Sequence, residues 1–433
     1  MPVRRLTSLL AIAVFVAVLA PPARAQGTAP VDLGKRSARS KYQLGRIYSV
    51  QELPDGRVVA SDIKEGAFRL IDLVKGDDVL IGRQGDEPDQ YRMARDILPL
   101  PGDSLWLYDP AGRKGLRLGP DGRVGAMVPF AAPAGSRGIL PTAADGSGRL
   151  YFTVSEFDTV SRTMKPAAML RRLSPASGAV DDVTPINMRR ADQLQAKGLL
   201  VFPFRDAWAV RKDGLVARVM ADSYQVVWTR DGQVTGRTGP LPYTPIPIST
   251  AEQQAISDSI HQGMKNMFGS AGIAGQPNRV IGDGGGGGRA VMFGDGGGGG
   301  GGSIQIFTRG AGDGGAIPVP SGAGNGGGRG TGQAITFNPA DIPIAPFPET
   351  KPAIPSSGVV AAFDPNGTLW VARERVRGDH TPKYDLIVEG KGIVGQVKLP
   401  ANTRIVGFGK SGVYLARVDG DAEWLERYPL PKM

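Results

Sequence analysis

The sequence contains no cysteine, which excludes disulfide bonds, thiolate metal ligands, cysteine nucleophiles and a lipid-modified N-terminal cysteine. Its only histidines are His261 and His380, too few for a metal centre built from several imidazoles. No G-x-S-x-G elbow occurs, and neither the glycine stretch at residues 82–85 nor the tract after Gly282 is followed by G-K-[ST]. These absences argue against thiol enzymes, elbow-type hydrolases and P-loop nucleotide-binding proteins.

Charge of one sign is not concentrated anywhere. The chain has 51 Lys and Arg against 41 Asp and Glu, interleaved and without a basic run. This distribution favours a solvated mixed surface over a surface that binds nucleic acid or an anionic polymer. Long apolar runs are absent after the first 25 residues, so we expect no membrane span in the rest of the chain.

The N-terminus has the three parts of a secretory signal peptide. Residues 1–5 are basic, residues 9–20 form an apolar run too short to span a bilayer, and Ala23-Arg24-Ala25 offers small residues to a signal peptidase. We predict cleavage after Ala25 and a periplasmic or secreted protein; a retained membrane anchor is the weaker alternative. Cleavage would remove three arginines and no acidic residue, and thus lower the formal net charge from +10 to +7.

From about residue 41 a module recurs in which short strands of alternating apolar and polar residues are separated by Asp-Gly or Asn-Gly turns. The six modules lie near residues 47–71, 103–122, 139–173, 207–232, 358–387 and 404–428. Such repeats are typical of four-stranded antiparallel blades around a channel. The last module is one strand short, and we expect residues 42–46 to supply that strand and close the ring. A pair of β-sandwiches is the competing architecture.

Three segments resemble a known family. They are residues 85–91 (GDEPDQY), the strand at 103–109 (DSLWLYD) and the hairpin at 113–123 (RKGLRLGPDGR). They are similar to the corresponding stretches of exported bacterial six-bladed β-propeller proteins of the NHL/TolB-like group, as are residues 346–352 and 407–428. The resemblance covers most of residues 41–429 outside the glycine tract and implies the propeller fold, but it brings no established activity.

An insertion separates the fourth and fifth modules. Ser249-Thr250-Ala251-Glu252 reads as a capping box, and Ile256, Ile260 and Met264 recur at helical spacing. We therefore predict a helix within residues 248–268 whose apolar face packs on its own domain. Residues 269–336 collapse into glycine runs, which predicts disorder, although short apolar stretches at 290–293 and 303–307 are candidates for transient strand pairing.

The sequence thus predicts an all-β chain with a signal peptide at 1–25, a linker at 26–40 and a six-bladed β-propeller over 41–433. The helix and the glycine-rich insertion lie between blades 4 and 5. No catalytic, cofactor-binding or metal-binding residue is assigned. The aspartates of the turns are explained by turn geometry alone; these are Asp55, Asp121, Asp145, Asp213 and Asp231.

For function, we expect a non-enzymatic binding propeller whose channel or loops hold a small molecule, a glycan or an envelope protein. The alternative is a calcium-dependent hydrolase of the lactonase type, in which Asp, Asn and Glu at the ring centre hold a Ca²⁺ ion that acts as a Lewis acid. That enzyme needs at least three convergent oxygen ligands in the channel. A role as a scaffold for other envelope proteins is a third hypothesis.

Overall fold

The computed structural model describes residues 29–88, 90–130, 140–158, 163–194, 196–270, 291–292, 305–306 and 343–432. The predicted signal peptide at residues 1–25 lies outside the described residues, as does most of the glycine-rich tract at 269–336. None of the helices in these ranges is long and apolar enough to cross a membrane.

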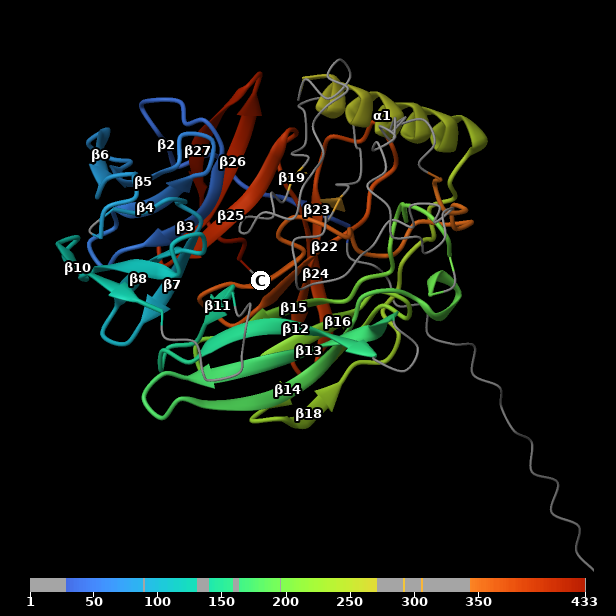
Figure 1. Ribbon diagram of the computed structural model, residues 1–433, viewed down its shortest axis with the longest axis horizontal. Helices are drawn as coiled ribbons and strands as arrows, with labels where there is room; N and C mark the ends of the chain where they lie inside the picture. The colour runs from blue at the N-terminus through green and yellow to red at the C-terminus, as the bar shows by residue number, and fades with distance from the viewer. Residues whose placement is uncertain are drawn as a thin grey trace, which may run out of the picture.

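Six antiparallel sheets follow one another along the chain and form a ring, which confirms the six-bladed β-propeller (Figure 1). Blade 1 comprises β3 (Ile47–Glu52), β4 (Val58–Asp62), β5 (Ala67–Asp72) and β6 (Asp77–Ile81). Blade 2 comprises β7 (Asp96–Leu100), β8 (Ser104–Asp109), β9 (Lys114–Leu118) and β10 (Val124–Pro129). Blade 3 comprises β11 (Ala143–Ala144), β12 (Leu150–Asp158), β13 (Thr163–Ser174) and β14 (Ala179–Asn187).

The second half of the ring repeats this order. Blade 4 comprises β15 (Ala207–Val210), β16 (Val216–Met220), β17 (Gln225–Arg230) and β18 (Gln233–Arg237). Blade 5 comprises β21 (Ala361–Phe363), β22 (Leu369–Ala372), β23 (Lys383–Val388) and β24 (Gly392–Lys398). Blade 6 comprises β25 (Thr403–Gly409), β26 (Gly412–Asp419) and β27 (Ala422–Tyr428). First strands of neighbouring blades contact one another, so each blade places its first strand nearest the ring centre.

The N-terminal segment closes the ring. β2 (Ala38–Arg39) pairs with β27 and becomes the fourth strand of blade 6, while β1 (Val31–Asp32) joins β24 as a fifth, parallel strand of blade 5. Closure from the N-terminal side is therefore as predicted, but the closing strand precedes residues 42–46 and lies in the segment predicted as a linker. Within residues 42–46 Leu44 forms an isolated antiparallel bridge with Glu423 of β27, and the Asp62 carboxylate then accepts the N–H groups of Gly45 and Arg46 and turns the chain into β3.

The two ends of a blade form two faces of the ring. Because each blade is an antiparallel meander, every first strand begins on one face, here called the entry face, and ends on the other, the exit face. Connections between blades lie on the entry face, and the turns after the first strands lie on the exit face. The position of a residue along its strand therefore shows on which face of the ring it lies.

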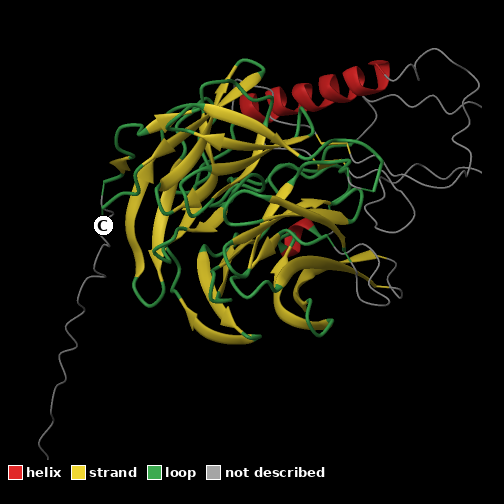
Figure 2. Ribbon diagram, turned by 90° about the vertical axis from the view of Figure 1, so that its left-hand side faces the viewer, coloured by secondary structure: helices red, strands yellow, loops and turns green. Residues whose placement is uncertain are grey.

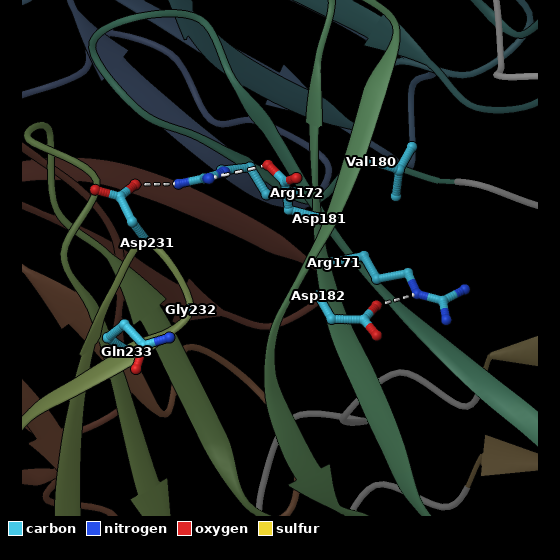
Figure 3. A pocket seen from close by; sticks show the side chains of 8 residues that line it. All are labelled: Arg171, Arg172, Val180, Asp181, Asp182, Asp231, Gly232 and Gln233. Atoms are coloured by element: carbon cyan, nitrogen blue, oxygen red, sulfur yellow. Dashed lines mark hydrogen bonds and ion pairs between the residues drawn. The ribbon is translucent and has the colours of Figure 1, made fainter.

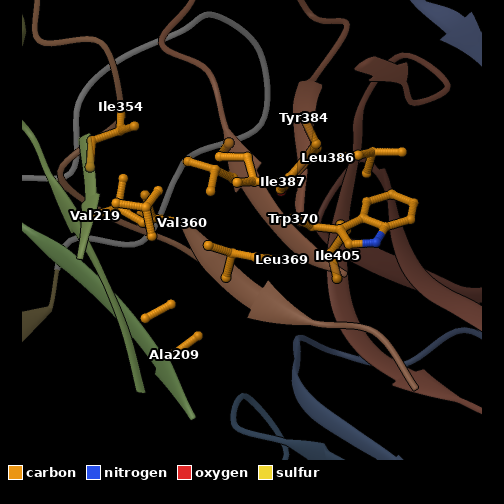
Figure 4. Packing of buried hydrophobic residues seen from close by; sticks show 14 of the residues in the cluster. Ala209, Val219, Ile354, Val360, Leu369, Trp370, Tyr384, Leu386, Ile387 and Ile405 are labelled. Atoms are coloured by element: carbon orange, nitrogen blue, oxygen red, sulfur yellow. The ribbon is translucent and has the colours of Figure 1, made fainter. Parts of the chain in front are cut away.

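The hydrophobic core lies between neighbouring blades. The largest cluster joins blades 4, 5 and 6 and includes Val219, Leu369, Trp370, Ile387 and Ile405 (Figure 4). A buried polar network crosses the boundary between blades 4 and 5 nearby. There the Asp385 carboxylate accepts hydrogen bonds from the Tyr224 hydroxyl, from Arg373 Nη1 at 3.0 Å and from Gln396 Nε2 at 2.7 Å.

The inserted helix forms as predicted. α1 spans Thr250–Ser270, and the Ser249 hydroxyl caps it by accepting the Glu252 N–H at 3.2 Å. Its buried face packs against Val201 and Phe202 in a small separate core; the helix contributes Ile256, Ile260 and Met264. Figure 2 shows the helix at the edge of the ring. β19 (Val291–Met292) and β20 (Gln305–Ile306) pair as an antiparallel ribbon, where the two short apolar stretches were expected.

Candidate functional site

The first strands of the six blades line one central channel with a volume of about 1310 Å³. Pockets for small molecules typically have volumes of roughly 300–1,000 Å³, so the channel has room for such a ligand and for water. Much of its wall is apolar and comes from all six blades; it includes Val50, Ile97, Pro99, Ala143, Ala209, Val210, Ala361, Phe363, Ile405 and Phe408.

The lining of the channel reaches the exit face. There it includes turn residues such as Pro54 of blade 1, Lys212 of blade 4 and Lys410 of blade 6. Leu430 of the C-terminal tail lines it as well, in keeping with the position of the C-terminus near the ring centre in Figure 1. The tail therefore narrows the channel on this side.

Asp96 is the acidic side chain that the fold places inside the channel near the entry face. It is the first residue of β7, lines the channel and is 8 % exposed. Burial raises the pKa of Asp96 to about 6, and the charge of Arg95 opposes that rise. Within the described ranges, its one ionic contact is with Arg95, whose Nε lies 3.7 Å from Oδ2. A carboxyl group with a pKa near 6 can exchange a proton close to neutral pH.

Tyr108 lies beside this carboxyl group. Asp96 and Tyr108 are paired residues of the β7–β8 ladder, so their side chains extend from the same face of blade 2, toward blade 3. The Tyr108 side chain is fully buried, and its hydroxyl has no hydrogen-bond partner among the described residues. Burial raises the pKa of Tyr108 to about 12, so the hydroxyl stays protonated and can donate a hydrogen bond.

Arg95 lies on the opposite side of the same strand, toward blade 1. Its Nη2 donates to the Tyr48 hydroxyl at 3.3 Å, and its guanidinium carbon lies 5.3 Å from the centre of the Tyr48 ring. The Arg95 Nε is buried without an acceptor in the part of the chain that the structure describes. Asp96 lines the channel, and two donors near it in blade 2, the Tyr108 hydroxyl and Arg95 Nε, are buried without an acceptor among the described residues. Such groups are costly to bury unless a ligand or water satisfies them.

Asp103 lines the channel as an exposed turn residue at the exit face, whereas three other lining carboxylates are held by protein partners. Glu52 accepts the Ser411 hydroxyl at 2.7 Å and the Tyr414 hydroxyl at 2.8 Å. Asp213 accepts hydrogen bonds from Arg211 and Arg230 at 2.8 and 2.7 Å. Asp364 accepts the Trp370 indole N–H at 3.1 Å. These three side chains fix turns and blade contacts and are not available to a ligand.

The described residues do not fit a calcium ion held by three carboxylates. Among them, no three Asp, Glu, His or Cys side chains come close enough together to hold a metal ion. The two histidines are also remote from the channel lining. His261 lies on α1 with a buried, unpaired Nε2, and His380 is an exposed loop residue. No chemical step is therefore assigned to a metal ion.

A second depression lies between blades 3 and 4 and is lined by charged residues (Figure 3). Arg172 bridges Asp181 of its own hairpin and Asp231 of the β17–β18 turn, and Arg171 pairs with Asp182 at 2.7 Å. Although burial opposes it, the hydrogen bonds to Asp231 and Asp181 raise the pKa of Arg172. Because these charges form ion pairs with one another, we interpret the depression as a structural contact that holds blades 3 and 4 together.

The turn aspartates have the structural roles that the sequence predicts. Asp55 and Asp121 accept the N–H groups two residues onward, those of Arg57 and Arg123. Asp145 accepts hydrogen bonds from Ser147, Arg149 and the Tyr151 hydroxyl, and Asp213 and Asp231 form the ion pairs described above.

Comparison with known proteins finds only remote similarities. No protein-family model matches the sequence, and no curated protein matches it significantly. The gluconolactonase XC5397 from Xanthomonas campestris has a similar structure, with a TM-score of 0.37 and 11% identity over 94% of this chain and 99% of that chain. The calcium-binding protein regucalcin from Agrobacterium tumefaciens has a TM-score of 0.35 and 9% identity over 93% of this chain and 100% of that chain.

Virginiamycin B lyase from Staphylococcus aureus is a third structure of this type, with a TM-score of 0.35 and 8% identity over 91% of this chain and 98% of that chain. Similarities this remote carry no conclusion about activity. The site must therefore be interpreted from its own residues.

The sequence did not reveal this site. Asp96 begins an ordinary strand, and Tyr108 falls within the strand motif that supports the family resemblance, where an aromatic residue is typical of a blade core. Their pairing across β7 and β8 could have distinguished them, but that pairing depends on the register of the hairpin.

Proposed function

We propose that the protein binds a small organic molecule in its central channel and that Asp96 and Tyr108 are its polar anchors. The observation that carries the proposal is the buried Asp96 carboxyl group on the wall of a largely apolar channel, paired in the β7–β8 ladder with Tyr108, whose hydroxyl has no hydrogen-bond partner among the described residues. The Tyr108 hydroxyl would donate to a carbonyl or hydroxyl oxygen of the ligand, and the Asp96 carboxylate would accept from a hydroxyl group. A ligand that carries hydroxyl and carbonyl groups on a compact apolar frame suits this arrangement.

The test is a ligand screen by thermal melting of the full chain, because a ligand that binds only the native state raises the melting temperature. We expect lactones or other hydroxylated carbonyl compounds to raise the melting temperature of the wild type. The rise for Tyr108→Phe should be at least tenfold smaller. Asp77→Asn is the control, since Asp77 is an exposed residue of β6 that does not line the channel. The proposal fails if the two variants respond to every compound alike.

A second candidate, hydrolysis of an ester or lactone, is favoured by the raised pKa of Asp96. Ionised Asp96 would accept a proton from water while the water oxygen bonds to the carbonyl carbon. The C–O bond to the leaving group would then break, and Asp96 would return the proton to the leaving oxygen. Arg95, whose Nε lies 3.7 Å from Asp96 Oδ2, would supply the positive charge that stabilises the developing oxyanion.

Hydrolysis is measured with a panel of lactones and aryl esters by proton release. We expect Asp96→Asn to lower kcat at least 100-fold, whereas Asp77→Asn, on the exposed β6, leaves it unchanged. Parallel assays in EDTA and in excess calcium test the calcium-dependent form of this activity. A wild type with no turnover in any of these assays would contradict hydrolysis and leave ligand binding as the proposed function.

A further inference from the structure

Arginines gather on the entry face of the ring. Arg46 directly precedes β3, Arg95 directly precedes β7, and Arg404 is the second residue of β25. A fourth, Arg205, lies two residues before β15 across the ring. Since all first strands begin on the entry face, the fold brings these side chains to the same side of the channel.

Two of these arginines donate hydrogen bonds to the first two residues of β3, directly after the third, Arg46. Arg404 Nη2 donates to the carbonyl oxygen of Ile47, and Arg95 Nη2 donates to the hydroxyl of Tyr48. Ile47 and Tyr48 are consecutive, and Arg46 comes directly before them. We call Arg46, Arg95 and Arg404 the arginine cluster. It draws on blades 1, 2 and 6, and through Arg95 it adjoins the channel residue Asp96.

The protein satisfies this cluster only in part. Arg404 pairs with Glu423, and Arg95 has Asp96 at 3.7 Å. The nearby Asp62 is fully buried and accepts backbone N–H groups, including those of Gly45 and Arg46, so it is already committed. In the described ranges the half-buried Arg46 side chain has no hydrogen bond or ion pair, and Arg95 Nε has no acceptor.

Guanidinium donors that remain unused beside a channel favour a planar, doubly bonded acceptor such as a carboxylate or phosphate group. Arg205 adds a further guanidinium group on the same face, and it has no ion-pair partner among the residues described. Burial lowers its pKa and so opposes its charged form. The unused guanidinium donors of the cluster and the additional guanidinium group of Arg205 make this face of the channel attractive to anions.

We propose that the channel ligand is a small organic anion whose carboxylate or phosphate group is held by the arginine cluster while its uncharged part reaches Asp96 and Tyr108. This inference rests on the proposed channel site and specifies the chemistry of its ligand. The apolar channel wall accommodates the remainder of such a molecule.

The experiment is calorimetric titration of the full chain with sodium tartrate and with sodium phosphate, against sodium chloride at equal ionic strength. We expect tartrate or phosphate to bind and chloride to give no saturable signal; the comparison shows which acid group is preferred. Arg46→Gln and Arg95→Gln should each weaken binding at least tenfold. Arg123→Gln, an exposed arginine on a turn of blade 2, should bind as the wild type does.

Arg46→Gln keeps the inference testable if Arg95→Gln fails to fold, because Arg46 has no side-chain partner to lose in the described chain. The inference is wrong if neither anion binds more tightly than chloride, or if Arg46→Gln and Arg123→Gln bind equally well. A neutral lactone whose binding depends on Tyr108 and not on the arginine cluster would overturn the inference and leave the proposed function intact.

Discussion

Asp96 and Tyr108 stand directly opposite each other in the β7–β8 ladder, and no hydrogen bond to another described residue satisfies either side chain. Buried carboxyl and phenol groups usually have a hydrogen-bond partner, either each other or another group. Their uncompensated state costs the fold free energy, so it should be visible in the stability of the protein without a ligand.

Asp96→Asn should stabilise the ligand-free protein at high pH. Burial raises the folded-state pKa of Asp96 from 3.8 to about 6, so the folded state holds its proton more tightly than the unfolded state does. The free energy of unfolding of the wild type therefore falls as the pH rises from about 4 through 6, and the asparagine variant escapes this loss. Above pH 7 the variant should gain up to roughly 3 kcal/mol. Urea unfolding at pH 4 and pH 8 measures the difference, which should vanish at pH 4. A less stable variant at pH 8 would show that the folded protein favours the charged carboxylate.

Tyr108→Phe should leave stability unchanged or slightly raised, because the hydroxyl that it removes has no partner among the described residues. Tyr151→Phe is the matched comparison. The Tyr151 side chain is equally buried, but its hydroxyl donates to Asp145 at 2.9 Å. Its removal should cost about 1–3 kcal/mol. Equal losses for the two variants in chemical denaturation would contradict the assignment of Tyr108 as uncompensated.

Lys351→Met should loosen the inserted helix. Lys351 and Glu252 form a nearly inaccessible ion pair at 2.8 Å between the first turn of α1 and the segment that leads to blade 5. Burial also raises the pKa of the adjacent Glu374, and the Glu252 charge contributes to that rise. Removal of the lysine leaves Glu252 buried and unpaired, which costs roughly 3–5 kcal/mol.

Hydrogen exchange of α1 amides measures that loss locally. The double variant Lys351→Met, Glu252→Gln should recover part of the protection, because it removes the unpaired charge as well. Unchanged protection in the single variant would show that the apolar face of the helix suffices to hold it.

Arg36→Ala should destabilise blade 6. Burial alone would raise the pKa of Glu426, but hydrogen bonds from Arg417, Arg36 and Tyr428 outweigh it and lower the pKa. Loss of the 2.6 Å contact from Arg36 should cost about 1–3 kcal/mol near neutral pH. The penalty should shrink as the pH falls through the folded-state pKa and Glu426 takes up a proton. Lys35→Ala, at the exposed neighbouring position, should cost nothing measurable in the same unfolding assay.

Much of the fold could be predicted because its signals are local. Asp-Gly and Asn-Gly turns mark the hairpins within each blade, and the capping box with the Ile256, Ile260 and Met264 stripe marks α1. The closing strand was misplaced because β2 has only two residues and no alternating pattern of its own. Its position is set by its partner β27, which lies at the far end of the chain.

The site could not be predicted for the same reason. Tyr224 meets Asp385 across 161 residues, and Arg404 meets Ile47 across 357, yet no short pattern in one sequence specifies such pairs. Asp96 and Tyr108 are near in sequence, but what distinguishes them is a lack of partners. Partners become countable only when neighbouring blades are packed against each other.

The pairing of β2 with β27 also determines when the protein can fold. Residues 38 and 39 are among the first of the ring to leave the ribosome, and their partners, Arg427 and Glu426, are among the last. Blade 6 therefore cannot be completed on a nascent or truncated chain, however well blades 1 to 4 form on their own. The N-terminal strand remains unpaired until β27 has been synthesised, so the ring can close only after the strands of all six blades have been made.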